Sequence, residues 1–254
     1  MARPFCCCPP TVKYSTMKLA VGLAGQYREH DTARASWGPL RDLGADFYMS
    51  TWRTTPCAAA QTRVLDREEI ASAGNFVCVD LHDETRYQGL AASDKHVFHI
   101  KQVMQRMASS TTRYDVIVLT RPDAWLEFGP GFNDFIHNIG SGCIYTEGEV
   151  RAEPAPSWLY VHDVLLIGQP ASMLAALSTL PFPLPKDSRG RLSKNIHFHL
   201  AVHFIINNID VRNYRPHVES AIVRDNAAGK VDISLADVHE LSRQWWEQHH
   251  SYGR

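Results

Sequence analysis

Short apolar runs that alternate with segments of helical periodicity constrain the fold of this chain more than any other feature. The runs at 17–24, 45–50, 75–80 and 114–120 predict buried strands. Segments 31–43, 66–73 and 93–108 lie between them and predict helices. This alternation is typical of a mainly parallel sheet with helices on both faces. We therefore expect an α/β fold with a Rossmann-like sheet.

The second half of the chain has a more mixed order of elements. Strands are predicted at 142–146, 159–167, 210–214 and 220–224, the last two at sheet edges, and helices at 132–139, 171–180, 194–208 and 234–250. Prolines, glycines and basic residues in 181–193 predict a surface loop that could close over a site. No repeat or domain boundary is visible. We expect a disordered tail over 1–16 and one domain over 17–254.

Charge and cysteine content exclude several classes of protein. The 254 residues carry 26 Lys and Arg against 27 Asp and Glu, a formal charge of −1, which gives no basis for non-specific nucleic-acid binding. No apolar stretch approaches the ~18 residues of a membrane-spanning helix. The six cysteines include no CxxC pair, so a structural zinc site is not expected and a reducing compartment is.

Polar side chains follow three of the predicted strands where each strand ends. Open α/β sheets bind ligands outside the carboxyl ends of their strands. Arginine binds phosphate in bidentate fashion, a carboxylate beside phosphate commonly holds a divalent cation, and tryptophan stacks on a base or sugar. The group predicts a site for a nucleoside diphosphate. Its members are Gly25, Gln26, Arg28, Trp52, Arg121 and Asp123.

Several catalytic signatures are absent from the sequence. It has no GxGxxG motif, no Walker lysine motif and no GxSxG elbow, which disfavours dinucleotide oxidoreductases, P-loop enzymes and α/β hydrolases. The histidines of 194–208 include a His-x-x-x-His spacing but no following glutamate, so the metalloprotease signature fails. Packing histidines and histidines lining an acceptor or phosphate pocket both remain open.

Four segments, 17–28, 45–52, 114–123 and 162–168, occur in an order that resembles a family of small GT-A-type glycosyltransferases. That family is found in bacterial polysaccharide clusters and in large viruses and phages. The resemblance implies a GT-A fold, a nucleotide-sugar donor and often Mn²⁺ or Mg²⁺. It also implies a cytoplasmic location, in the host cell if the protein is viral.

The resemblance assigns roles to individual residues. Gly25, Gln26 and Arg28 are expected to contact the donor nucleotide, and Asp123 falls on the Asp-x-Asp-like metal element. Arg121 stands in the first acidic position of that element, which leaves one carboxylate for a metal. We expect Arg121 to take over part of the cation's role by neutralising the leaving diphosphate.

The remaining assignments concern the acceptor and the helix at 93–108. Asp163 matches the aspartate that would face the acceptor, and it is a candidate general base if the reaction inverts the anomeric centre. Lys101 and His96 are candidate phosphate contacts, although a solvated helix face is the favoured interpretation of both. His197, Arg189 and Arg191 are the candidate acceptor contacts.

The sequence thus predicts a hexosyl- or pentosyltransferase that moves a sugar from a nucleotide-diphosphate sugar to an acceptor hydroxyl. The acceptor is a glycan or, given the basic residues near 186–194, a modified nucleobase in DNA. The alternative is a nucleotide- or sugar-binding protein without turnover, which the missing second acid of the metal element favours. The donor sugar, the stereochemistry and the oligomeric state are left open.

Overall fold

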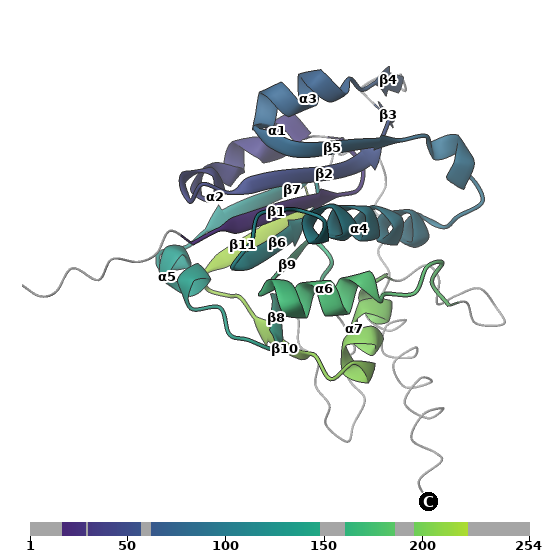
Figure 1. The fold of residues 1–254 in the computed structure, drawn as a ribbon. Helices are drawn as coiled ribbons and strands as arrows, with labels where there is room; N and C mark the ends of the chain where they lie inside the picture. Colours follow the sequence, from purple (N-terminus) through teal and green to yellow (C-terminus); the bar gives the residue numbers. More distant parts are fainter. Residues whose placement is uncertain (1–16, 29, 57–61, 148–160, 186–195, 223–254) are drawn as a thin grey trace, which may run out of the picture.

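A mainly parallel sheet runs through the part of the chain that the computed structural model describes, residues 17–28, 30–56, 62–147, 161–185 and 196–222. Seven strands of this part form the sheet, in the order β10-β8-β9-β6-β1-β2-β5 (Figure 1). Their bounds are β1 Leu19–Ala24, β2 Asp46–Trp52, β5 Phe76–His82, β6 Val116–Thr120, β8 Cys143–Thr146, β9 Leu165–Gly168 and β10 Asp210–Asn213.

One strand of the sheet runs against the others. β6, β1, β2 and β5 are parallel to one another, as are β8 and β10, whereas β9 is antiparallel to both β6 and β8. Thr120, the last residue of β6, therefore pairs with Leu165, the first residue of β9. The segment that leads into β9 arrives at the same sheet edge as the loops that follow β1 and β6.

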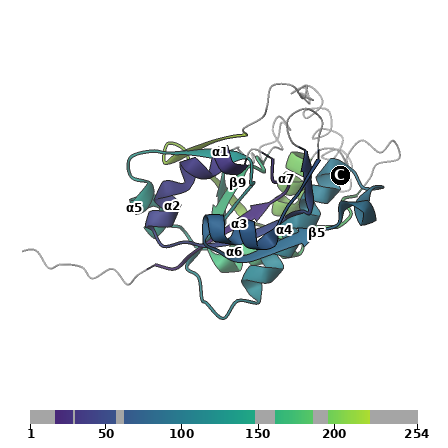
Figure 2. The same cartoon turned by 90° about the horizontal axis from the view of Figure 1, so that it is seen from above.

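Helices cover both faces of the sheet, as predicted. Alternate residues of β1 point to the two sides, with Val21 and Leu23 in one apolar cluster and Ala20 and Ala24 in the other. The first side is covered by α1 (His30–Arg34), η1 (Ala35–Trp37), α2 (Gly38–Asp42), α3 (Arg67–Gly74) and α5 (Phe132–His137). The second is covered by α4 (Ala92–Ala108), α6 (Pro170–Ser178) and α7 (Ile196–Ile206) (Figure 2).

Two small antiparallel sheets were not predicted. β7 (Ala124–Phe128) pairs with β11 (Val218–Ile222), so the strand expected at 220–224 lies beside β7 and not at an edge of the main sheet. β3 (Thr54–Pro56) pairs with β4 (Thr62–Val64). β7 alternates buried and exposed side chains from Ala124 onward, a two-residue period that is the usual signal of a half-buried strand.

Other predicted helices and strands differ from the observed ones in where they begin and end. The helix expected at 31–43 is divided into α1, η1 and α2, with Pro39 in the first turn of α2. The strand expected from residue 159 begins at Leu165. The predicted helix 234–250 and the tail 1–16 lie outside the described residues, and the single-domain organisation stays a prediction. No helix among the described residues is long and apolar enough to span a bilayer.

α4 packs very closely on β1, because Gly22 has no side chain. A Cβ added at Gly22 would overlap the Cγ1 atom of Val103 and approach the Cε atom of Met107 to 2.9 Å. Val103 is β-branched, so it has few alternative rotamers with which to yield. This contact sets the distance between β1 and the helix that carries His96 to the sheet edge.

We predict that Gly22→Ala lowers the free energy of unfolding by about 1–3 kcal/mol through overpacking. Gly89→Ala is the matched control, because Gly89 does not have a left-handed φ and a methyl group added there would meet open space. That change is expected to be neutral or stabilising by up to about 1 kcal/mol. Urea denaturation of the two variants measures the difference, and equal stabilities would contradict the close packing.

His30 belongs to the apolar core beside the loop that follows β1. Its ring lies 4.3 Å from that of Tyr27 and 5.3 Å from that of Trp37, centroid to centroid. The Nε1 atom of Trp37 donates a hydrogen bond of 3.0 Å to the carbonyl oxygen of Ala124, which ties η1 to the start of β7. Burial lowers the pKa of His30 to about 4, although Asp31 acts in the opposite sense.

We predict that His30 makes the fold sensitive to acid. Its pKa is about 4 in the folded chain against 6.5 unfolded, so the unfolded state takes up a proton first as the pH falls. The contribution of His30 to the free energy of unfolding is complete above pH 6.5. It falls by about 3 kcal/mol as the pH is lowered to about 4. Unfolding free energies at pH 7.5 and 4.5 are expected to differ less in His30→Leu than in the wild type. An unchanged difference would contradict this.

Candidate functional site

The loops that follow β1 and β6 meet at one buried carboxylate. The Nε atom of Arg28 lies 2.8 Å from Asp123 Oδ2. Arg121 binds the same carboxylate with two nitrogens, Nε 2.8 Å from Oδ1 and Nη2 3.0 Å from Oδ2. The Asp123 side chain is 1% exposed. The predicted convergence of Arg28 and Arg121 at this sheet edge is therefore present, with Asp123 between them.

Local backbone features create this meeting point. Gly25 has φ 128°, a conformation that residues with a Cβ rarely adopt, and its N–H donates to the carbonyl oxygen of Ser50 at 3.1 Å. Pro122 follows β6 and cannot continue its hydrogen bonding, and the N–H of Ala124 donates back to the carbonyl oxygen of Arg121 at 3.1 Å. These two turns aim Arg28 and Arg121 toward each other.

A second buried carboxylate extends the cluster. Asp163 lies just before β9, and its Oδ2 atom is 3.7 Å from Arg121 Nη1. Histidines from two different helices flank it. His96 Nε2, from α4, is 3.4 Å from Oδ2, and His197 Nδ1, from α7, is 3.4 Å from Oδ1. The antiparallel direction of β9 is what brings Asp163 to this edge.

Charges within the cluster hold one another in their ionised forms. Burial by itself raises the pKa of Asp123, but the hydrogen bonds and charges of Arg121 and Arg28 bring it below its ordinary value. Burial also raises the pKa of Asp163, and His197, His96 and Arg121 outweigh that effect and lower it. Burial lowers the pKa of His96 to about 4, so its ring is neutral at pH 7. The guanidiniums of Arg28 and Arg121 thus stand against an equal number of carboxylates, those of Asp123 and Asp163.

Arg28 is the member of the cluster best placed to meet an anion. Its side chain is 31% exposed and contacts Asp123 through Nε alone. Within the described part of the chain its two terminal nitrogens make no hydrogen bond. A guanidinium with outward-facing N–H groups is the usual partner of a phosphate. Gln26, in the same turn, is partly exposed beside it.

The side chains present do not fit the metal role predicted for Asp123. Both of its oxygens already accept hydrogen bonds from guanidinium nitrogens at 2.8–3.0 Å, and a cation would have to replace those contacts. Mn²⁺ and Mg²⁺ also require several oxygen ligands. Among the described residues no group of three or more His, Cys, Asp or Glu side chains is arranged to hold a metal ion.

Two of the predicted donor contacts lie away from the cluster. Trp52 is 2% exposed and stacks on Phe98 with ring centroids 5.7 Å apart, so its faces are not available to a base. The Nζ atom of Lys101 donates to the carbonyl oxygens of Ser178 and Leu180 at 2.7 and 2.8 Å. Their positions do not support the predicted stacking and phosphate roles. Arg189 and Arg191 lie outside the described residues.

Sequence reasoning favoured a solvated helix face at His96, and that expectation is wrong. His96 is three residues after Ser93 and four before Ile100, which are both buried, so helical spacing places it on the inward face of α4. That spacing is the signal that could have identified it. Nothing in the sequence indicated that this face would meet the residue preceding β9.

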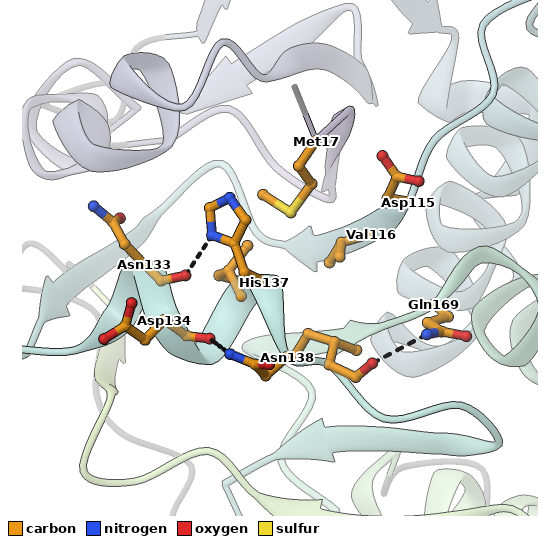
Figure 3. Close-up of a pocket in the computed structure, with 10 residues that line it drawn as sticks. Met17, Asp115, Val116, Asn133, Asp134, His137, Asn138 and Gln169 are labelled. Atoms are coloured by element: carbon orange, nitrogen blue, oxygen red, sulfur yellow. Dashed lines mark hydrogen bonds between the residues drawn. The ribbon is translucent and has the colours of Figure 1, made fainter. Parts of the chain in front are cut away.

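A cavity of about 430 Å³ lies elsewhere, next to the residues at which β1 and β6 begin (Figure 3). None of the predicted site residues lines it. Its polar side chains bond locally: His137 Nδ1 contacts the carbonyl oxygen of Asn133 at 2.7 Å, and Gln169 Nε2 donates to that of Ile139 at 3.0 Å. The cluster around Asp123 remains the stronger candidate, because it combines buried charges with an accessible guanidinium.

Comparisons with known proteins add little to this description. No family model and no curated protein sequence matches the chain. One similar solved structure is the galactosyltransferase LgtC in complex with donor and acceptor sugar analogues, with 9% identity and a TM-score of 0.44 over 78% of this chain and 73% of that one. A likeness at this level carries no argument about substrate or catalytic residues.

We predict that Asp123→Asn destabilises the protein by about 3–5 kcal/mol, because it leaves the buried guanidinium of Arg121 without its full counter-charge. Asp210→Asn is the matched control. It breaks the pair of Asp210 Oδ2 with Arg212 Nε, also 2.8 Å long but exposed on both sides, and is expected to cost at most about 1 kcal/mol. Urea denaturation measures the free energy of unfolding of both variants. A similar decrease in the two would contradict the stabilising role of the buried ion pairs of Asp123.

Proposed function

We propose that this protein is a glycosyltransferase of the GT-A type that moves a sugar from a nucleotide-diphosphate sugar to an acceptor hydroxyl. The observation that carries the proposal is the pair of guanidiniums, Arg28 and Arg121, that share Asp123 at the carboxyl edge of the sheet. Three of the family-like segments, 17–28, 114–123 and 162–168, contribute to this one cluster. That coincidence supports a common ligand.

In this proposal the arginines act on the leaving diphosphate. Negative charge builds on its oxygens as the bond to the anomeric carbon breaks, and preorganised cationic groups lower that barrier. Arg28 offers its terminal nitrogens to the diphosphate, while Arg121 supplies a second, buried positive charge next to it. Because both are held by Asp123, little reorganisation is needed when the donor binds.

A binding protein without turnover is the second candidate. The balance of two guanidiniums against two carboxylates favours it, because such a cluster has no surplus positive charge for a leaving group. The poor fit of Asp123 to a metal ion also favours a binding protein without turnover. The two candidates differ in whether a bound donor is broken down.

We predict that a nucleoside diphosphate binds and depends on Arg28. Thermal unfolding with UDP, GDP, CMP and dTDP, and with the matching sugar nucleotides, is expected to show a shift for one base. At 100 times Kd, binding contributes about 2.7 kcal/mol. Arg28→Ala is expected to remove the shift, and the exposed Arg212→Ala to retain it. The wild-type shift is expected to persist in EDTA, because Asp123 is not arranged as a metal ligand.

Turnover of the identified sugar nucleotide then separates the candidates. We expect release of the nucleoside diphosphate, with water as the acceptor. At the same donor concentration, we expect the rate of release to be lower in Arg28→Ala than in the wild type by a factor of about 10²–10³. Binding without any release would favour the non-catalytic protein. No shift with any of the nucleotides would contradict both candidates.

A further inference from the structure

The ring of His96 lies between the two turns that form the proposed diphosphate site. A Cβ atom added at Gly25, which begins the loop after β1, would lie 3.4 Å from His96 Nδ1 and 3.8 Å from Pro122 Cδ. Pro122 belongs to the turn after β6, between Arg121 and Asp123. Because Gly25 carries no side chain, that residue leaves open the space in front of His96 Nδ1.

The two ring nitrogens of His96 have different surroundings. Nε2 is fully buried and lies 3.4 Å from Asp163 Oδ2. Nδ1 makes no hydrogen bond within the described part of the chain, but it is not fully buried, and the His96 side chain as a whole is 10% exposed. One nitrogen therefore faces a carboxylate in the interior, and the other can be reached by a ligand at the sheet edge.

The Asp163 carboxylate fixes the position of the ring proton of His96. Burial lowers the pKa of His96 to about 4, so the ring is neutral at pH 7 and carries one proton. The pKa of Asp163 is lower still, so the positive charge of His96 is present at the low pH at which that carboxyl titrates and is absent at pH 7. At pH 7 the ionised carboxylate next to Nε2 favours the tautomer with the proton on that nitrogen. The lone pair is then on Nδ1, which can only accept a hydrogen bond.

A nitrogen that accepts hydrogen bonds selects among the groups of a sugar nucleotide. Phosphate oxygens are themselves acceptors, so they do not pair with Nδ1 of His96. The hydroxyl groups of the ribose and of the transferred sugar can donate. Arg121 Nη1 lies 3.7 Å from the same Asp163 oxygen that faces His96, so the sugars attached to a diphosphate at Arg28 and Arg121 would lie near His96.

We propose that His96 is a specificity-determining residue that accepts, at Nδ1, a hydrogen bond from a hydroxyl group of the bound sugar nucleotide. This inference rests on the proposed binding of a nucleotide-diphosphate sugar. The hydroxyl belongs to the ribose or to the transferred sugar, which share this chemistry. A site built around such a bond discriminates against ligands that lack the hydroxyl, because its own polar group is then left without a partner.

Calorimetric titration of the full-length protein at pH 7 measures this preference. The probes are the nucleoside diphosphate that gives the thermal shift, its 2′-deoxy and 3′-deoxy forms, and the matching sugar nucleotide with analogues that each lack one sugar hydroxyl. Removal of the bound hydroxyl is expected to raise Kd by a factor of about 5–30, because Nδ1 of His96 loses its donor. A weaker binding of a deoxy nucleoside diphosphate assigns the ribose, and an effect confined to the sugar analogues assigns the transferred sugar.

Two substitutions separate the hydrogen bond from packing. His96→Leu has no acceptor and is expected to bind the parent ligand and the deoxy analogue with the same Kd. His96→Asn keeps an acceptor oxygen at the δ position and is expected to retain part of the preference. His203→Leu is the matched control, because His203 lies on α7 and bonds to the carbonyl oxygen of Ala176 on α6 at 2.8 Å. It is expected to keep the full preference.

Equal affinity of the wild-type protein for the parent ligands and all their deoxy analogues would overturn the inference without the use of any variant. A preference that persists unchanged in His96→Leu would also overturn it, because another group would then hold the hydroxyl. Both results leave nucleotide binding intact, so they would leave the proposed function standing. Absence of binding by any of the nucleotides would overturn the proposed function and this inference with it.

Discussion

The site depends on one interaction, the sharing of the Asp123 carboxylate by Arg28 and Arg121. A buried carboxylate is stable only when its charge is paired and its oxygens accept hydrogen bonds. Asp123 satisfies both conditions with side chains from two different loops, at distances of 2.8–3.0 Å. The loop after β1 and the turn after β6 are thereby held in one position, 95 residues apart in the chain. Without the Asp123 carboxylate, the loop after β1 and the turn after β6 would lose this connection.

The direction of β9 completes the site. A parallel strand at that place in the sheet would have brought its carboxyl end, and not its amino end, to the edge beside β6. Because β9 is antiparallel, Asp163 lies within 3.7 Å of Arg121, and the helices α4 and α7 approach it with one histidine each. The cluster is thus a product of sheet topology as much as of the residues that form it.

Local patterns in the sequence predicted much of the fold and part of the site. The strands at β1, β2, β5 and β6 were recognisable because buried parallel strands are continuous apolar runs, and the position of Arg28 and Arg121 followed from the rule that parallel strands end at one edge. The partners of these residues were not predictable. The pairing of β7 with β11 joins segments about ninety residues apart, and no local pattern encodes it. Trp52 looked accessible because it ends a strand, but α4 covers it.

A crystal structure of the protein with the bound nucleoside diphosphate tests the central claim most directly. The account predicts diphosphate oxygens within about 3 Å of the terminal nitrogens of Arg28, next to Arg121, with Asp123 still holding both guanidiniums. A nucleotide bound elsewhere, for example in the cavity beside α5, with Arg28 and Arg121 unchanged, would contradict it.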